Sequence, residues 1–168
     1  MMKPDVSKLL DNARTLADIF EVVKTAVLRS RKLGRGGLML GLADLGNYPE
    51  GFFGAFYPVG TNVIVMNKVP LQRIKDTMPR LYKPYAFHVL LHEYLHSLGH
   101  LNEAEVRQMV YDISRESFGE EHDATMIARD TRPFLHNLSY PDISWQPENL
   151  QIELLDDFDR SSTNCYIG

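Results

Sequence analysis

The sequence predicts an α+β domain in which a small antiparallel or mixed three-stranded sheet packs against helices. Between residues 38 and 66 the apolar residues fall into three short runs rich in aromatic and β-branched side chains, which is typical of strands. On both sides of this region they recur at steps of three and four, the spacing that places them on one face of a helix.

Length and composition favour one globular unit and exclude several classes of partner. The 168 residues are 44% hydrophobic and 24% charged, which is enough for a single core, and the formal net charge of −4 gives no cationic footprint for nucleic acid. Cys165 is the only cysteine, so no disulfide can form within the chain. Because no apolar run approaches the roughly 20 residues of a membrane span and the start lacks a signal-peptide core, we expect a cytoplasmic protein.

The N-terminal segment, residues 5–32, has helical spacing. Thr15 and Asp18 resemble a capping box, which predicts two helices rather than one. Basic residues gather where the segment ends, a position in which cations complement the helix dipole. In an acidic chain we interpret this cluster as a solvated helix end rather than a nucleic-acid patch; it comprises Arg29, Arg31, Lys32 and Arg35.

The predicted strands are residues 38–45, 52–57 and 61–66. A turn of about three residues joins the second to the third, which predicts an antiparallel hairpin. A short helix over residues 69–77, with Pro70 in its first turn, and a proline-punctuated link follow.

The segment from Pro84 to Gly99 is a strongly periodic helix that contains His92-Glu93-Tyr94-Leu95-His96, an HExxH motif. Its apolar residues form one face and leave His92, Glu93 and His96 on the flank. Residues four apart lie one turn apart, so both imidazoles can point at one metal ion, while the carboxylate of Glu93 can reach a water bound to that ion.

A second helix follows, with Asn102 as its N-cap and Glu105 as capping partner, and it ends near Gly119. Residues 123–135 could add a further short helix. We expect residues 1–138 to form the functional domain and residues 139–168 an irregular C-terminal tail.

A catalytic zinc ion needs three protein ligands and one open position, so one ligand remains to be found. Glu103, Glu105 and His122 are the candidates that spacing leaves open. His88 and His100 are rotated away from each other on the helix, because four residues advance it about 40° past a full turn. We expect these two histidines to be structural or to support the ligands.

The motif HEYLHSLG matches the start of the metzincin signature, but the third histidine of that family would fall at Asn102. The run Asn102-Glu103-Ala104-Glu105 instead resembles the start of the glutamate helix of gluzincins, and residues 38–118 are most similar to the small minigluzincins. This resemblance implies a zincin-like fold and a zinc metallopeptidase. It also implies one catalytic Zn²⁺ held by His92, His96 and Glu103, with Glu93 as general base and acid.

The same resemblance implies a peptide or protein substrate that binds as an extended strand along residues 61–66 or 52–57. Candidate oxyanion donors are Tyr111, His122, His136 and Tyr140. We also predict that residues after about 137 lie in or near the cleft and restrain the enzyme, with Asp156, Asp157, Asp159 and Cys165 able to approach the metal.

Two alternatives stay open. The motif HGxLHLxGxDH of rRNA-processing metal-dependent endoribonucleases has the same first spacing, but it lacks the glutamate and needs a histidine where this chain has Asn102. The other alternative is a zinc-binding interaction module without turnover.

Overall fold

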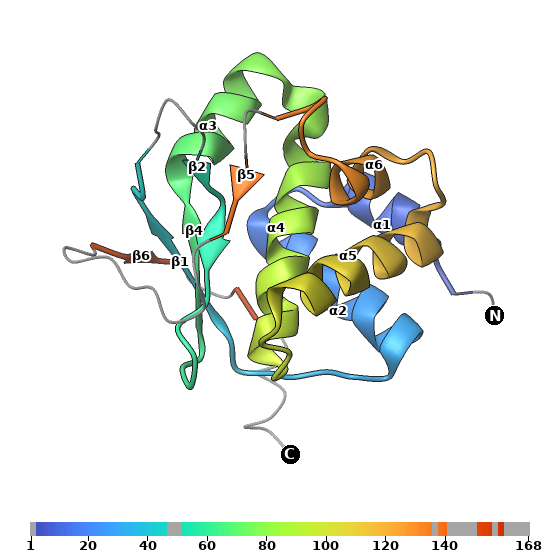
Figure 1. Ribbon diagram of the computed structural model, residues 1–168, viewed down its shortest axis with the longest axis horizontal. Helices are drawn as coiled ribbons and strands as arrows, with labels where there is room; N and C mark the ends of the chain where they lie inside the picture. Colours follow the sequence, from blue (N-terminus) through green and yellow to red (C-terminus); the bar gives the residue numbers. More distant parts are fainter. Residues whose placement is uncertain (1–2, 47–51, 136–137, 141–150, 156–157, 160–168) are drawn as a thin grey trace.

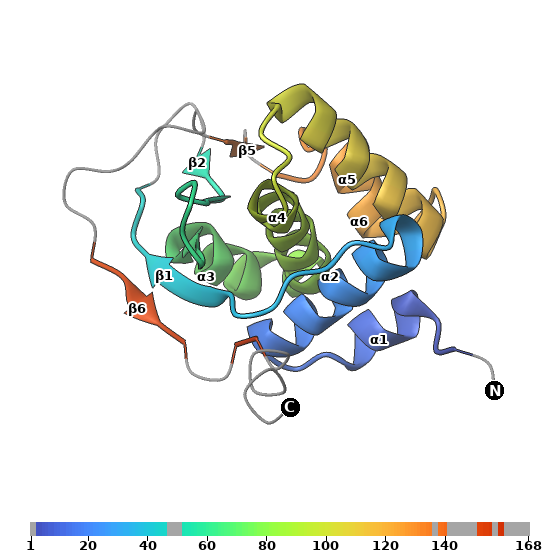
Figure 2. The ribbon, with the colours of Figure 1, turned by 90° about the horizontal axis from the view of Figure 1, so that it is seen from below.

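The computed structural model describes residues 3–46, 52–135, 138–140, 151–155 and 158–159. Within them the chain is α+β, with six α-helices, a four-stranded mixed sheet and a separate pair of two-residue strands. The sheet lies on one side of the molecule and most of the helices lie on the other, with the helix that carries the HExxH motif between them (Figures 1 and 2). No helix in the described part of the chain combines the length and apolar character required to cross a bilayer.

Two helices open the chain, α1 (Val6–Asn12) and α2 (Leu16–Arg31). They separate at Thr15, whose side chain accepts a hydrogen bond from the amide of Asp18, while the Asp18 carboxylate accepts from the amide of Thr15. This reciprocal pair satisfies amides that the helix start leaves free. The predicted capping box is therefore confirmed.

The main sheet has the order β3-β4-β1-β6. β1 (Met39–Ala43) runs parallel to β4 (Val63–Asn67), and β3 (Ala55–Phe56) runs antiparallel to β4. The hairpin is thus confirmed. The sheet gains a fourth strand from the tail, because β6 (Glu153–Leu154) pairs antiparallel with β1.

The predicted single strand over residues 52–57 is wrong. β2 (Phe52–Phe53) leaves the main sheet and pairs in parallel with β5 (Leu138–Ser139). Gly54 separates β2 from β3 at a crowded point, where an added Cβ would lie 2.9 Å from the Leu138 side chain. Any larger residue there would push Leu138 away.

Helix α4 (Tyr82–Ser97) follows α3 (Lys68–Thr77) and a short 3-10 helix (Pro79–Leu81). Every residue of α4 from Pro84 to Ser97 is buried. The prediction of one apolar face with the motif on its flank is wrong, because α4 is surrounded: it contacts the sheet, α2 and two later helices. A helix enclosed in this way is apolar around most of its circumference.

Two helices complete the helical layer, α5 (Glu103–Phe118) and α6 (Asp123–Arg129). Asn102 caps α5 as predicted, since its side chain accepts a hydrogen bond from the amide of Glu105. The predicted helix over residues 123–135 is too long. It ends at Arg129, because Asp130 adopts an extended backbone and its carboxylate binds the amide of Arg132.

Part of the tail packs on the body of the fold, contrary to the expectation of an irregular segment. Phe158 is buried and stacks on Phe20 with ring centroids 4.4 Å apart. The buried carboxylate of Asp159 accepts hydrogen bonds from Lys24 at 2.6 Å and from the amide of Leu38 at 3.0 Å. Asp159 therefore anchors the tail at α2. Of the other tail residues expected to approach a metal, Asp156, Asp157 and Cys165 lie outside the described residues.

Candidate metal centre

Three side chains from two helices converge at one point. His92 and His96 come from successive turns of α4, and Glu103 is the first residue of α5. Between the helices the chain reverses at Gly99, whose φ of +104° is a conformation that residues with a Cβ rarely adopt. This tight reversal brings the start of α5 back beside the second half of α4.

The distances between the three groups fit a metal ion. His92 Nε2 and His96 Nε2 are 3.2 Å apart, and the Glu103 carboxylate lies 3.1 Å from the first and 2.7 Å from the second. Ligands in a tetrahedral zinc site, about 2.0–2.1 Å from the ion, are roughly 3.3 Å from one another. The ligand atoms therefore need to separate by only a few tenths of an ångström, and two imidazoles with one carboxylate form a common ligand set of catalytic zinc.

The second nitrogen of His96 is held by the backbone. Its Nδ1 donates to the carbonyl oxygen of His100 at 2.7 Å, which orients the ring and is the usual support for a metal-binding histidine. Nε2 of His96 faces Glu103 at 2.7 Å, and an imidazole that donates from both nitrogens carries a proton on each. A metal ion at Nε2 would displace one of these protons.

His92 is supported differently. Its Nδ1 is buried without a hydrogen-bond partner in the described part of the chain. The ring of Tyr140 lies flat against the His92 ring, with centroids 3.7 Å apart and an angle of 1° between the planes. On the side away from Glu103, stacking on Tyr140 rather than a hydrogen bond at Nδ1 supports the His92 ring.

Glu93 lies beside the centre but is not one of its three converging groups. It is 2% exposed, and burial raises the pKa of its carboxyl to about 8, despite the opposing charge of His96. A buried carboxyl with a pKa near neutrality can both accept and release a proton, which suits a general base and acid.

Burial and the contacts among the three converging groups shift their pKa values. Burial alone would raise the pKa of Glu103, but hydrogen bonds from His92 and His96 outweigh it and lower the pKa to about 2. Burial lowers the pKa of His92. Burial acts in the same direction on His96, yet its hydrogen bonds and the charge of Glu93 raise its pKa overall. Glu103 therefore stays ionised and His92 neutral, which are the protonation states that bind metal.

The other two candidate ligands lie elsewhere. Glu105 is exposed, and it is not one of the residues whose ligand atoms converge. His122 caps α6, where its Nδ1 accepts a hydrogen bond from the amide of Ala124 and its ring stacks on Phe118. The structure thus brings Glu103, and neither Glu105 nor His122, to the two histidines.

The strands proposed for substrate binding differ in their access. β4 lies between β3 and β1, and its Val65 and Met66 pair with β3, so this part of residues 61–66 has no free edge for a substrate strand. β3 is at the edge of the main sheet. β5 pairs with β2, the strand just before β3.

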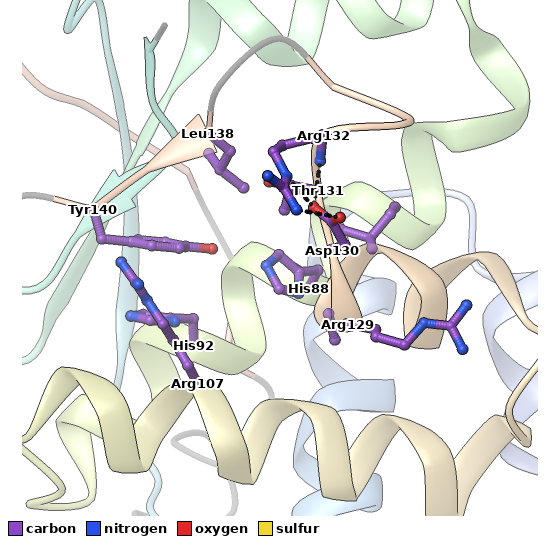
Figure 3. A pocket seen from close by; sticks show the side chains of 11 residues that line it. His88, His92, Arg107, Arg129, Asp130, Thr131, Arg132, Leu138 and Tyr140 are labelled. Atoms are coloured by element: carbon purple, nitrogen blue, oxygen red, sulfur yellow. Dashed lines mark hydrogen bonds and ion pairs between the residues drawn. The ribbon is translucent and has the colours of Figure 1, made fainter.

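A cavity of about 300 Å³ adjoins the centre and shares His92 with it (Figure 3). Its walls come from α4, α5, α6 and the segment around β5, and they include His88, Arg107 and Tyr140. His88 is buried, and its pKa is lowered to about 3 by burial and by its neighbour His92. Arg107 is not among the residues that the sequence predicted for the site. Its position four residues after Glu103 places both side chains on one face of α5 and could have indicated it.

The predicted oxyanion donors Tyr111 and His122 do not line the cavity beside His92. Tyr111 lines a neighbouring hollow between α5 and α6, which shares Arg107, Ala128 and Arg129 with the cavity but does not include His92. His122 is engaged as a cap. His136 lies outside the described residues. Tyr140 is the candidate that the structure brings to the centre.

Comparisons with models of known protein families, with curated proteins and with solved structures gave no match for this chain.

Proposed function

We propose that this protein is a zinc-dependent metallopeptidase of the gluzincin type, with His92, His96 and Glu103 as ligands of one catalytic Zn²⁺. The observation that carries the proposal is the convergence of these three ligand groups within 4.8 Å, with the buried Glu93 next to them on α4. The resemblance to minigluzincins, drawn from HExxH and from Asn102-Glu103, supports the same assignment. A zincin-like arrangement of sheet and helices is part of this proposal.

A zinc ion bound there supplies Lewis acidity to a water molecule and to the scissile carbonyl. Glu93 takes a proton from the attacking water and passes it to the nitrogen of the scissile bond. The leaving group therefore departs as a neutral amine and not as an amide anion. The low exposure of Glu93 keeps bulk water from competing for that proton.

We place the substrate as an extended strand beside β3 and β2. β3 is an edge strand, and β2 already pairs with another strand, which supports strand addition along this line. β5 pairs with β2 on this line, and Tyr140 stacks on His92. We therefore include in the proposal a restraint of activity by the segment 138–140.

The test combines metal content with cleavage. Wild type, Glu93→Gln and the control Glu105→Gln are loaded with zinc, and zinc stoichiometry and cleavage of unfolded casein are measured together. We expect one zinc per chain in all three proteins and cleavage by wild type and by the control only. If neither zinc-loaded wild type nor a zinc-loaded Tyr140→Ala variant, which lacks the proposed restraint, cleaves casein, the protein is instead a zinc-binding interaction module. Loss of zinc in Glu93→Gln would refute the role of Glu93.

A further inference from the structure

The cavity beside His92 is cationic. Arg107, Arg129 and Arg132 line it together with one carboxylate, Asp130. Arg132 binds Asp130 through two contacts of 2.9 Å, the dashed pair in Figure 3. Two arginines thus remain without a paired carboxylate among the described residues, in a chain whose net charge is −4. A concave site with excess positive charge concentrates anions.

Arg107 is the cation of this cavity that comes from α5, the helix that also carries Glu103. It lies four residues after Glu103 on α5, a spacing at which a glutamate and an arginine ordinarily pair. Glu103 is instead engaged by His92 and His96, which leaves Arg107 available. Arg107 lines the same cavity wall as His92 and Tyr140, whereas Arg129 points away from His88 in Figure 3.

Two buried polar atoms on the cavity wall have no partner within the described part of the chain. They are Nδ1 of His88 and the hydroxyl oxygen of Tyr140. A neutral imidazole and a phenol can each donate one hydrogen bond. Buried groups of this kind are costly unless something satisfies them, so they indicate a polar ligand.

We propose that this cavity is a subsite for a carboxylate of the substrate, with Arg107 as its specificity-determining residue and His88 and Tyr140 as further donors. The inference rests on the proposed peptidase function and adds the substrate class: peptides that carry a carboxylate next to the scissile bond. That carboxylate is either an acidic side chain or the C-terminus of the peptide, and the two sources present the same chemistry to Arg107.

The first experiment measures specificity with matched peptides. Quenched fluorescent peptides of one alanine-rich sequence, blocked at both ends, carry a single Glu or a single Gln at each position in turn. A second set has Gln and a free C-terminal carboxylate. For zinc-loaded wild type, we expect kcat/KM to favour one Glu position, or the free C-terminus, by about 10- to 100-fold, the effect of a charge-assisted hydrogen bond.

Arg107→Gln should abolish this preference while leaving cleavage of the uncharged peptides in place. Arg115→Gln is the matched control, because Arg115 lies on the same helix outside the cavity, and it should keep the preference. Thermal melts establish that both variants are folded. If Arg107→Gln is not folded, Arg107→Lys replaces it and should reduce the preference, since lysine lacks the two-pronged geometry.

Binding separates this inference from the proposed function. The same peptides are titrated into zinc-loaded Glu93→Gln and into Glu93→Gln combined with Arg107→Gln, with fluorescence anisotropy as readout. Tighter binding of carboxylate peptides that depends on Arg107, without cleavage by either wild type or Tyr140→Ala, would refute the peptidase and support the subsite. Equal binding of acid and amide peptides, no binding of either, or a preference that survives Arg107→Gln would overturn the subsite.

Discussion

The ring of Tyr140 lies flat on the ring of His92, and this stacking supports a histidine whose Nδ1 makes no hydrogen bond within the described residues. The two rings are 3.7 Å apart and parallel to within 1°, while His92 Nδ1 has no partner in the described residues. One residue of the tail segment therefore orients a candidate metal ligand.

The first prediction concerns zinc affinity. Tyr140→Ala should weaken zinc binding by about 10-fold, because removal of the ring takes away the stacking support of His92 and leaves only the contacts of its Nε2. Tyr140→Phe keeps the ring and should bind zinc as wild type does. Its stability should be unchanged or slightly higher, since the buried hydroxyl finds no partner among the residues that the structure describes. Competition with a chromogenic chelator measures both affinities, and equal losses in the two variants would contradict the stacking role.

The second prediction concerns restraint of activity by segment 138–140. At equal zinc occupancy, Tyr140→Ala should cleave a short unfolded peptide faster than wild type, because Tyr140 covers one face of the centre. This substitution is a cleaner test than truncation before Ser139. Truncation also removes Phe158 and Asp159, which are buried in the fold. A Tyr140→Ala protein no faster per bound zinc than wild type would rule the restraint out.

The third prediction separates the two acids at the start of α5. Glu103→Gln should lower zinc affinity by at least about 10-fold, because a neutral amide is a poor ligand. Glu105→Gln removes only a first-turn charge and should lower the unfolding free energy by about 0.3–1 kcal/mol. Zinc titration of both variants measures the affinities, and urea melts of both measure the unfolding free energies. The opposite ranking for zinc would mean that Glu103 is not the ligand.

The fourth prediction concerns the support of His96. The hydrogen bond runs to the backbone oxygen of His100, so His100→Ala should leave zinc affinity nearly unchanged. Gly99→Ala forces a Cβ into a backbone with φ of +104°, although nothing lies within 4 Å of that Cβ. Gly99→Ala should lower the unfolding free energy by about 1–2 kcal/mol and weaken zinc binding, because it displaces the carbonyl of His100 that supports His96. Zinc loss in His100→Ala would show that the side chain matters instead.

The fifth prediction concerns the anchor of the tail. Asp159→Ala should lower the unfolding free energy by about 3–5 kcal/mol, because it removes a buried acceptor from Lys24 and from the Leu38 amide. Glu21→Gln is the control. Glu21 also contacts Lys24, at 3.0 Å, but its side chain is 31% exposed, and the expected loss is below about 1 kcal/mol. Urea melts that give similar losses for both would contradict the anchor.

The parts of this structure that the sequence predicts are those fixed by short spacings. Thr15 and Asp18 are three residues apart, and the two histidines are separated by one helical turn. Asn102 marks the start of α5, which places Glu103 on its first turn. In each case the geometry follows from a single helix or its cap.

The features that the sequence does not predict depend on partners far along the chain. The pairing of Phe52 with Leu138 involves strands of two residues, too short for any periodic pattern. Asp159 meets Lys24 across 135 positions, and neither residue indicates the other locally. The burial of α4 on all sides was not predicted for a similar reason, because periodicity describes one helix and not the elements that enclose it.

The candidate centre combines a rigid side and a side that opens readily. His92 and His96 belong to a helix enclosed by the fold, and we expect its amides to exchange hydrogen only through large-scale opening. Glu103 is the first residue of α5, and helix ends fray on much faster timescales. Release of a bound ion would then follow the fraying of one helical turn, so the lifetime of the loaded state can change through residues that cap α5 while the fold keeps its global stability.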